Sequence, residues 1–362
     1  MKKNTQLIFL LLITQSSFAQ QTKLIRVQSR NIKNDIFWNT KDGRSINSQG
    51  GGIFRFADPV TGVKKYYWYG VHYAGSPLQL VLFHAKGSPK LVDGTVVMNV
   101  KQQLTNINDA LKLITSFKEL KNIPIVIGES DPEGCAACGM ATNPSNAYRN
   151  GTMYSSYTAA SFARKYELAD KYNANLIGAV TWAFEFEDQP WFYGFRDLAT
   201  NGVDKPVLNV FRMFGMMTGK RVDVQATNMY SLKNILDSSV RAQTDIGALA
   251  SKDDNSAAVM LWNYHDEDKQ NEICTTKVAI NGLPDKKIKF IEYRIDNKTS
   301  NSYEHWKFLG MPQNPTTEQI KELEVSGHLL AYFLEQPIVK NGTAEINIAL
   351  PRQGVYLLKL TW

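Results

Sequence analysis

The sequence lacks long apolar runs and has few of the residues that build metal or nucleic-acid sites. Of its 362 residues, 3 are cysteines and 5 are histidines. The apolar run at residues 7–13 is too short to cross a bilayer, and no other stretch approaches that length. No dense run of Lys and Arg occurs, so the formal net charge of +7 indicates a solvated basic surface. We therefore expect no nucleic acid and no membrane among its partners.

The first residues have the pattern of an export signal. Lys2 and Lys3 precede the apolar run, and Ser17 and Ala19 place small residues at the two cleavage-site positions. Gln20 stands where a lipid-anchored protein would have cysteine. We predict a signal peptide at residues 1–19 and a secreted or periplasmic protein.

Two of the cysteines are close together, in Cys135-Ala-Ala-Cys138. In an exported protein this spacing indicates a local disulfide or a free pair. Cys274 is the only other thiol and is distant in sequence, which disfavours zinc. We expect neither metal nor cofactor, with both cysteines at the rim of a cleft.

The composition is ordinary for a soluble globular protein, at 43% apolar and 21% charged residues, but its character changes twice along the chain. Residues 28–75 are rich in Gly, Tyr and Trp. Alternation at residues 52–56 and 66–69, with a turn at Asp58–Pro59 and Gly62, predicts two antiparallel strands. This segment is the expected N-terminal β-hairpin.

Residues 78–221 alternate between strand and helix patterns. Apolar runs predict strands at 78–83, 124–127 and 176–182, and helical spacing predicts helices around 107–117 and 157–166. These intervals suit β/α units of a barrel with long loops.

Residues 222–362 read as all-β. Alternation predicts strands at 257–264, 277–280, 288–293, 344–350 and 355–360, and therefore a β-sandwich. One helix interrupts them, with Thr316 and Gln319 in capping-box spacing.

Several polar and aromatic residues follow the predicted barrel strands, where such folds place catalysis. Glu129 follows the second strand, although a carboxylate there is more often simply solvated. Aromatic rings beside carboxylates suit a sugar site, because rings stack on pyranose faces and carboxylates accept hydroxyl bonds. The candidate substrate-binding residues are His84, Lys86, Asp131, Trp182, Glu185, Glu187 and Arg196.

Three motifs then resemble glycoside hydrolase family 39, which contains β-xylosidases and α-L-iduronidases. They are His84–Pro89, Pro124–Gly134 and Trp182–Asp197, and the likeness continues over about residues 78–362. The resemblance implies the last three β/α units of a (β/α)8 barrel followed by a C-terminal β-sandwich, an α/β plus all-β fold. It also implies retaining hydrolysis of O-glycosyl bonds, with Glu129 as nucleophile and Lys86 contacting the substrate.

The chain departs from that family in two ways. The family's acid/base is the Glu of an Asn-Glu-Pro motif on the fourth barrel strand, and this sequence has no such motif. Residues 28–75 resemble instead the opening blade of a family 43 glycoside hydrolase, through Trp38–Gly43, Ile46–Gly52 and Lys65–Gly70, although Gln49 stands where many relatives have His. The sequence thus looks like a fusion near Gly75.

This combination leaves three hypotheses for function. The first is a β-xylosidase-like hydrolase that is weak or inactive alone. The second is an exo-glycosidase completed by a partner chain or by self-association. The third is a non-catalytic carbohydrate-binding or remnant protein. In each, the partner is an oligo- or polysaccharide.

Overall fold

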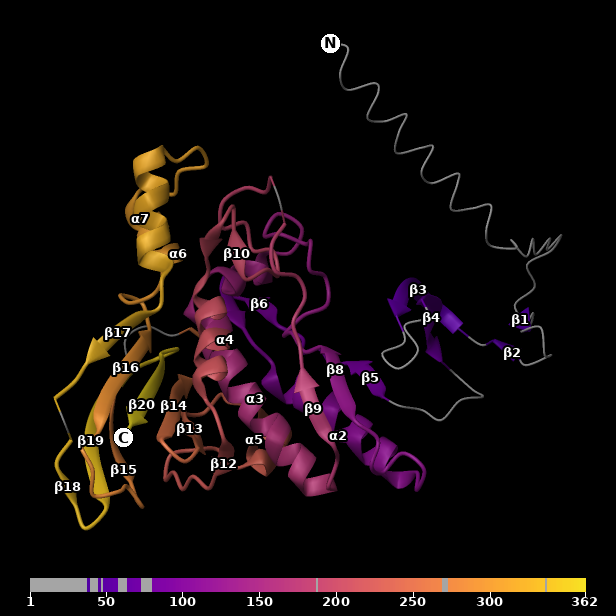
Figure 1. Ribbon diagram of the computed structural model, residues 1–362. Coiled ribbons are helices and arrows are strands. Elements are labelled where there is room, and N and C mark those ends of the chain that lie inside the picture. The colour runs from indigo at the N-terminus through magenta and orange to yellow at the C-terminus, as the bar shows by residue number, and fades with distance from the viewer. Residues whose placement is uncertain are drawn as a thin grey trace. The chain divides into compact units, whose positions relative to one another are not determined.

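The computed structural model describes residues 38–39, 45–46, 48–57, 64–72, 80–186, 188–268, 273–335 and 337–362. The chain divides into two compact units, Met1–Pro77 and Leu78–Trp362 (Figure 1). The predicted signal peptide lies outside the described residues.

The N-terminal unit contains two pairs of antiparallel strands. β1 (Trp38–Asn39) pairs with β2 (Ser45–Ile46), and β3 (Ser48–Ala57) pairs with β4 (Lys64–His72). The register of the β3–β4 pair shifts between Ser48 and Gly51, at the start of the glycine run 50–52. The antiparallel strands expected at 52–56 and 66–69 are confirmed, whereas the likeness to a propeller blade stays a prediction.

A three-stranded parallel sheet opens the second unit. Its order is β5 (Val81–His84), β8 (Ile125–Glu129) and β9 (Leu176–Ala179). These are the three predicted barrel strands, with β5 starting later and β9 ending earlier than expected. The crossovers are α2 (Val100–Ser116) and α3 (Thr152–Tyr172), at the predicted helical positions. Among the described residues these three strands form no closed barrel.

Helix α2 forms where the sequence has both a cap and an apolar stripe. The Asn99 side chain accepts a hydrogen bond from the Gln102 backbone N–H at the N-terminus. Leu104, Ile107 and Leu111 are fully buried at helical spacing and pack against the sheet.

Helix α3 lies at the centre of the unit and is buried along most of its length. It contacts α2 and β9 on one side (Figure 1). On the other side it contacts three strands of an antiparallel sheet, β13 (Asp245–Lys252), β14 (Ser256–Tyr264) and β20 (Val355–Thr361). Asn173 ends it in the left-handed conformation, at φ 48°.

Short elements connect these layers. They are the hairpins β6 (Lys90–Val92)–β7 (Thr95–Val97) and β10 (Ala199–Thr200)–β11 (Val203–Asp204), the 3₁₀ helix η1 (Pro144–Asn150), and the helices α4 (Pro206–Met216) and α5 (Leu232–Ser238).

The C-terminal half contains two antiparallel sheets. One has six strands, in the order β12 (Lys220–Val222), β13 (Asp245–Lys252), β14 (Ser256–Tyr264), β20 (Val355–Thr361), β16 (Lys289–Ile295) and β17 (Leu330–Phe333). The other has three, in the order β15 (Ile273–Ile280), β19 (Thr343–Pro351) and β18 (Val339–Lys340). Each of the five strands predicted from alternation falls on one of these.

Strand β14 shows how the layers share their cores. All nine of its residues are buried. Met260 and Trp262 belong to the apolar cluster that includes α2 and α3, whereas Val259 and Leu261 belong to the cluster shared by the two antiparallel sheets. Since side chains alternate along a strand, β14 is covered on both faces.

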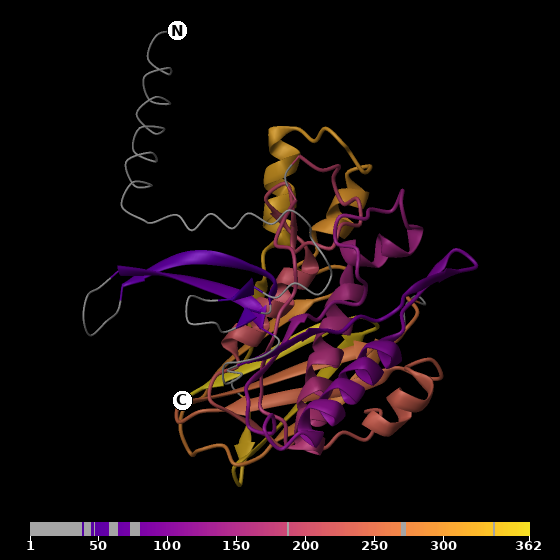
Figure 2. The same ribbon diagram turned by 90° about the vertical axis from the view of Figure 1, so that its right-hand side faces the viewer.

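Helices α6 (Ser302–Phe308) and α7 (Thr317–Gly327) lie together at one end of this unit (Figure 2). The predicted capping box of Thr316 and Gln319 is confirmed at the start of α7. No helix of the described residues combines the length and apolarity needed to span a bilayer.

Candidate active site

The candidate site lies at the carboxyl ends of the parallel strands. Glu129 ends β8, and in the parallel register it is paired with His84, the last residue of β5. Lys86 and Asp131 follow two residues after these strand ends. Parallel strands bring their carboxyl ends to one edge of a sheet, so residues distant in sequence meet there.

Two cations hold the carboxylate of Glu129. Its Oε2 accepts hydrogen bonds from Lys86 Nζ at 2.7 Å and from Arg196 Nη2 at 2.6 Å. Its Oε1 lies 3.7 Å from His84 Nδ1. The Glu129 side chain is 25% exposed, so one oxygen is anchored while the group stays accessible.

The same contacts set the ionisation of Glu129. Burial raises its pKa, but the hydrogen bonds and charges of Lys86 and Arg196 more than offset this and hold the pKa below its ordinary value. Glu129 is therefore a carboxylate at neutral pH. This is the state that a nucleophile requires and the wrong state for a general acid.

Asp131 lies beneath Glu129 and is 1% exposed. Its carboxylate accepts from Lys86 Nζ at 3.1 Å and from the Tyr154 hydroxyl at 3.1 Å, and also contacts the Thr181 hydroxyl. Arg196 Nε lies 3.6 Å away. Its surroundings therefore fit a residue that positions Lys86 and Arg196 better than one that touches substrate.

The loops carrying these residues approach closely. A Cβ added at Gly87 would lie 2.7 Å from the Pro132 carbonyl oxygen and 3.0 Å from the Tyr157 hydroxyl. Only glycine therefore lets the Lys86 loop pass this near to the loop after β8.

Arg196 is 1% exposed and joins several parts of the site. Besides Glu129, its guanidinium donates to the carbonyls of Trp182 at 2.7 Å, of Gly134 at 2.9 Å and of Glu133. The predicted site residues His84, Lys86, Asp131 and Arg196 thus lie around Glu129, and Trp182 is linked to them through its backbone carbonyl.

The aromatic and acidic residues after β9 divide into two groups. Trp182 is 54% exposed, and its ring meets Phe186 edge-on at 5.9 Å. Glu185 instead accepts a hydrogen bond from the Gly202 N–H at 2.5 Å in the β10–β11 hairpin, and none of its described contacts is with Glu129. Glu187 lies outside the described residues.

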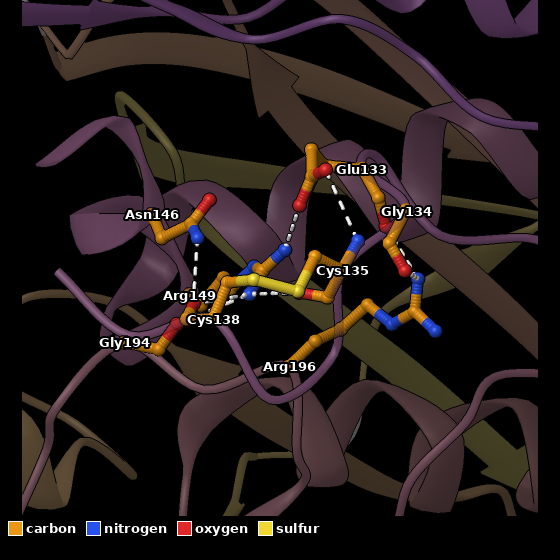
Figure 3. Close-up of a disulfide and its surroundings, with 8 residues drawn as sticks. All are labelled: Glu133, Gly134, Cys135, Cys138, Asn146, Arg149, Gly194 and Arg196. Atoms are coloured by element: carbon orange, nitrogen blue, oxygen red, sulfur yellow. Dashed lines mark hydrogen bonds and ion pairs between the residues drawn. A yellow bond between two sulfur atoms is a disulfide. The ribbon is translucent and has the colours of Figure 1, made fainter. Parts of the chain in front are cut away.

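The loop after Glu129 contains a disulfide, the first of the two alternatives that the sequence left open. Cys135 and Cys138 are bonded (Figure 3). The fully buried Arg149 donates to both of their carbonyls, at 3.0 and 3.1 Å, and pairs with the Glu133 carboxylate. Within the described part of the chain, no group of His, Cys, Asp and Glu side chains is arranged to hold a metal ion.

Sequence reasoning missed Tyr154, Thr181 and Arg149. Tyr154 lies on the buried α3, where an aromatic at helical spacing predicts core packing and gives no sign of where its hydroxyl points. Arg149 follows a run of small and polar residues that gave no signal.

A known protein family matches most of the chain. The family described as "Glycosyl hydrolases family 39" matches residues 71–328, while no curated protein matches. The resemblance to family 39 that the sequence predicted over about residues 78–362 is therefore confirmed, with the match ending at residue 328. Nothing in the comparisons bears on the family 43 resemblance.

Solved structures show the same fold at low identity. A GH39 enzyme from Xanthomonas axonopodis pv. citri is 14% identical with a TM-score of 0.57, covering 79% of this chain and 55% of that one. A monomeric β-xylosidase from Caulobacter crescentus CB15 is 12% identical with a TM-score of 0.56, covering 79% and 56%. A bacterial orthologue of human α-L-iduronidase is 15% identical with a TM-score of 0.61, covering 84% and 51%.

The chain spans about half the length of these solved structures. The family match nevertheless extends over more than half of the chain, from before β5 to the end of α7. It includes Glu129 and every residue found around it. The chain belongs to glycosyl hydrolases family 39.

Proposed function

We propose that this protein is a retaining, β-xylosidase-like glycoside hydrolase in which Glu129 is the nucleophile, and that the chain alone is weakly active or inactive. The observation that carries the proposal is the ionised Glu129 carboxylate, with one oxygen held by Lys86 and Arg196 at the carboxyl ends of the parallel strands.

The two oxygens of Glu129 have different roles in this mechanism. Oε2 accepts from both cations, whereas Oε1 has the His84 ring as its neighbour, with Nδ1 at 3.7 Å. Oε1 is therefore the atom that attacks the anomeric carbon. As the glycosidic C–O bond breaks, a covalent glycosyl-enzyme forms and the leaving oxygen needs a proton.

Among the residues that the structure describes, no second carboxylate contacts Glu129 to supply that proton. A retaining enzyme places its acid/base about 5–5.5 Å from the nucleophile. The Asn-Glu-Pro motif that would supply it is absent from the sequence. Asp131, which shares Lys86 with Glu129, already accepts hydrogen bonds from Lys86 and Tyr154 and is therefore not placed to donate a proton. Weak activity of the chain alone follows from this.

A second polypeptide that brings a carboxylate, either a partner chain or another copy, would complete the site. The face of the parallel sheet turned away from α2 and α3 favours this reading. Leu82 is 55% exposed and Ile177 is 61% exposed there, whereas Val81, Phe83 and Ile127 on the other face pack into the core.

The proposed substrate is an oligosaccharide of the xylose type, which the exported protein binds outside the cytoplasm. Trp182 supplies an exposed ring for stacking on a sugar face, and Lys86 supplies a donor for a hydroxyl. The exposed Trp182 also favours a second candidate, non-catalytic carbohydrate binding, in which the same ring binds sugar without turnover.

Covalent trapping tests the nucleophile. A dinitrophenyl 2-fluoro-xyloside needs little protonation of its leaving group, so it should add one fluoro-sugar to Glu129, seen by intact mass and peptide mapping. Glu129→Gln should not be labelled, and Glu119→Gln, on an exposed residue, should be labelled like the native chain. Sugar binding with no adduct would favour the non-catalytic reading.

A further inference from the structure

The backbone around Cys135–Cys138 is bound by two buried arginines. Arg149 is fully buried and donates to the carbonyls of Cys135 and Cys138. Arg196 donates from its guanidinium to the carbonyls of Glu133 and Gly134 (Figure 3). Its backbone N–H donates to the Ala136 carbonyl at 2.9 Å. Five carbonyls of this six-residue loop, residues 133–138, therefore face the two arginines.

Arg196 links the loop to the nucleophile. Its Nη1 binds loop carbonyls, while its Nη2 binds Glu129 Oε2 at 2.6 Å. A guanidinium is planar, with its donors in a fixed fork, so its two ends cannot be turned independently. A shift of the loop must either rotate Arg196 or leave buried donors without partners, which is costly.

The disulfide closes the loop that supplies these carbonyls. Cys135 is exposed and Cys138 is partly exposed, so a small reductant can reach the bond. Glu133 holds the other end of the loop, because its carboxylate pairs with Arg149 and accepts the Cys135 N–H at 3.1 Å. Besides the hydrogen bonds to the two arginines, the loop is thus held by one covalent bond and one ion pair.

We propose that the Cys135–Cys138 disulfide is a redox-sensitive support for Arg196, through which it positions the Glu129 carboxylate. This regulation rests on the proposed role of Glu129. In the reductive step a small dithiol breaks the S–S bond, each sulfur becomes a thiol, and the dithiol closes to its own disulfide. The loop carbonyls then lose their fixed places, and Arg196 no longer holds Glu129 Oε2.

The charges around Glu129 give the direction of the effect. The groups that face it are Lys86, Arg196 and His84, and Asp131 shares the first two. Burial raises the pKa of Glu129, and the two cations lower it. Withdrawal of Arg196 removes one of the two cations that lower the pKa of Glu129, so this pKa rises when the disulfide is reduced.

The test follows Glu129 by carbon NMR in the full chain, with its signal assigned by Glu129→Gln. The pKa of Glu129 should be higher in the dithiol-treated protein and in the Cys135→Ser/Cys138→Ser variant than in the oxidised protein. The double variant should no longer respond to dithiol. Cys274→Ser is the matched control, because that thiol lies in β15 near Thr276, and it should behave like the native chain.

A second readout is the rate of labelling by the fluoro-xyloside. Loss of one charge-assisted hydrogen bond should slow it by about tenfold or more. An unchanged Glu129 titration after complete reduction, verified by thiol count, overturns the proposal. General unfolding on reduction, seen by circular dichroism, also overturns it, because the effect is assigned to the site. If even the oxidised protein is not labelled, the nucleophile proposal fails while the titration still decides the disulfide's role.

Discussion

Two ionisable side chains, Asp131 and Lys165, are buried near the site. The Asp131 carboxylate accepts hydrogen bonds from Lys86, Tyr154 and Thr181 and forms an ion pair with Arg196, so its charge is compensated. The Lys165 ammonium lies 3.7 Å from the centre of the Phe162 ring and 3.4 Å from Ser161 Oγ. The two residues should therefore respond oppositely to removal of their charge.

Asp131→Asn should destabilise the fold. The substitution removes one partner of a buried ion pair and leaves Lys86 and Arg196 facing an amide, which costs about 3–5 kcal/mol. Glu129→Gln, on a side chain that is 25% exposed, should cost less. Urea unfolding of both variants measures the difference, and equal losses would show that Asp131 does not hold the network.

Lys165→Met should stabilise the fold by about 1–3 kcal/mol, because a polar group in an apolar site is replaced by an apolar chain of similar length. Burial holds the pKa of Lys165 well below its usual value, although the charge of Asp131 opposes this. Between the folded and unfolded pKa values the unfolded chain binds more protons, so native stability rises with pH in that window.

The measurement is urea unfolding of native protein and Lys165→Met between neutral pH and about pH 10, near the unfolded pKa of lysine. In Lys165→Met the free energy of unfolding should no longer rise with pH over this range. If both proteins show the same slope, another group is responsible for it.

At the scale of elements, the end that carries α6 and α7 supports the loop with Arg196. The rings of Tyr303 and Trp306 meet Phe192 at 5.4 and 5.1 Å. The Gln313 side chain bonds the backbone of Trp191 in both directions, at 2.9 and 3.2 Å. The residues before Arg196 thus depend on helices more than 100 positions away in the chain.

Thr316→Ala should loosen this end by removing the cap of α7. Its hydroxyl accepts the Gln319 N–H at 3.3 Å, and the Gln319 side chain accepts the Thr316 N–H at 2.9 Å. Loss of such a cap costs about 1 kcal/mol. Thr317→Ala, one residue later on an exposed position, should change unfolding by less than about 0.5 kcal/mol. Equal effects in denaturant unfolding would contradict the role of the cap.

The order of strands and helices could be predicted from local patterns. The apolar run at 124–127 indicated a strand, and helical spacing indicated α2 and α3. Register could not be predicted. The contacts of Glu129 with Lys86 and Arg196 join residues 43 and 67 positions apart, and they depend on how parallel strands align. Motif likeness, and not periodicity, pointed to these residues.

At the scale of the whole molecule, the proposed mechanism has Glu129 as nucleophile but lacks the Asn-Glu-Pro motif of the family's acid/base. Lys86 and Arg196 keep the Glu129 carboxylate ionised, but the second half of a retaining reaction needs a base to activate water. The chain spans about half the length of the solved family structures.

The isolated chain should therefore stall after its first chemical step. With a dinitrophenyl β-xyloside the leaving group departs without protonation, the glycosyl-enzyme forms on Glu129, and its hydrolysis is slow for want of a base. Unactivated xylobiose should show negligible turnover. Stopped-flow absorbance should show a burst close to one dinitrophenolate per chain followed by a slow steady rate.

Azide should relieve this stall. It is a nucleophile that needs no base, so it can attack the anomeric carbon, break the bond to Glu129 and release a β-glycosyl azide with the carboxylate restored. We expect the steady rate to rise roughly 10–100-fold, part of the ~10²–10⁴-fold that a general base contributes. Glu129→Gln should give neither burst nor azide product. Fast hydrolysis of xylobiose without azide would mean instead that this chain supplies its own second carboxylate.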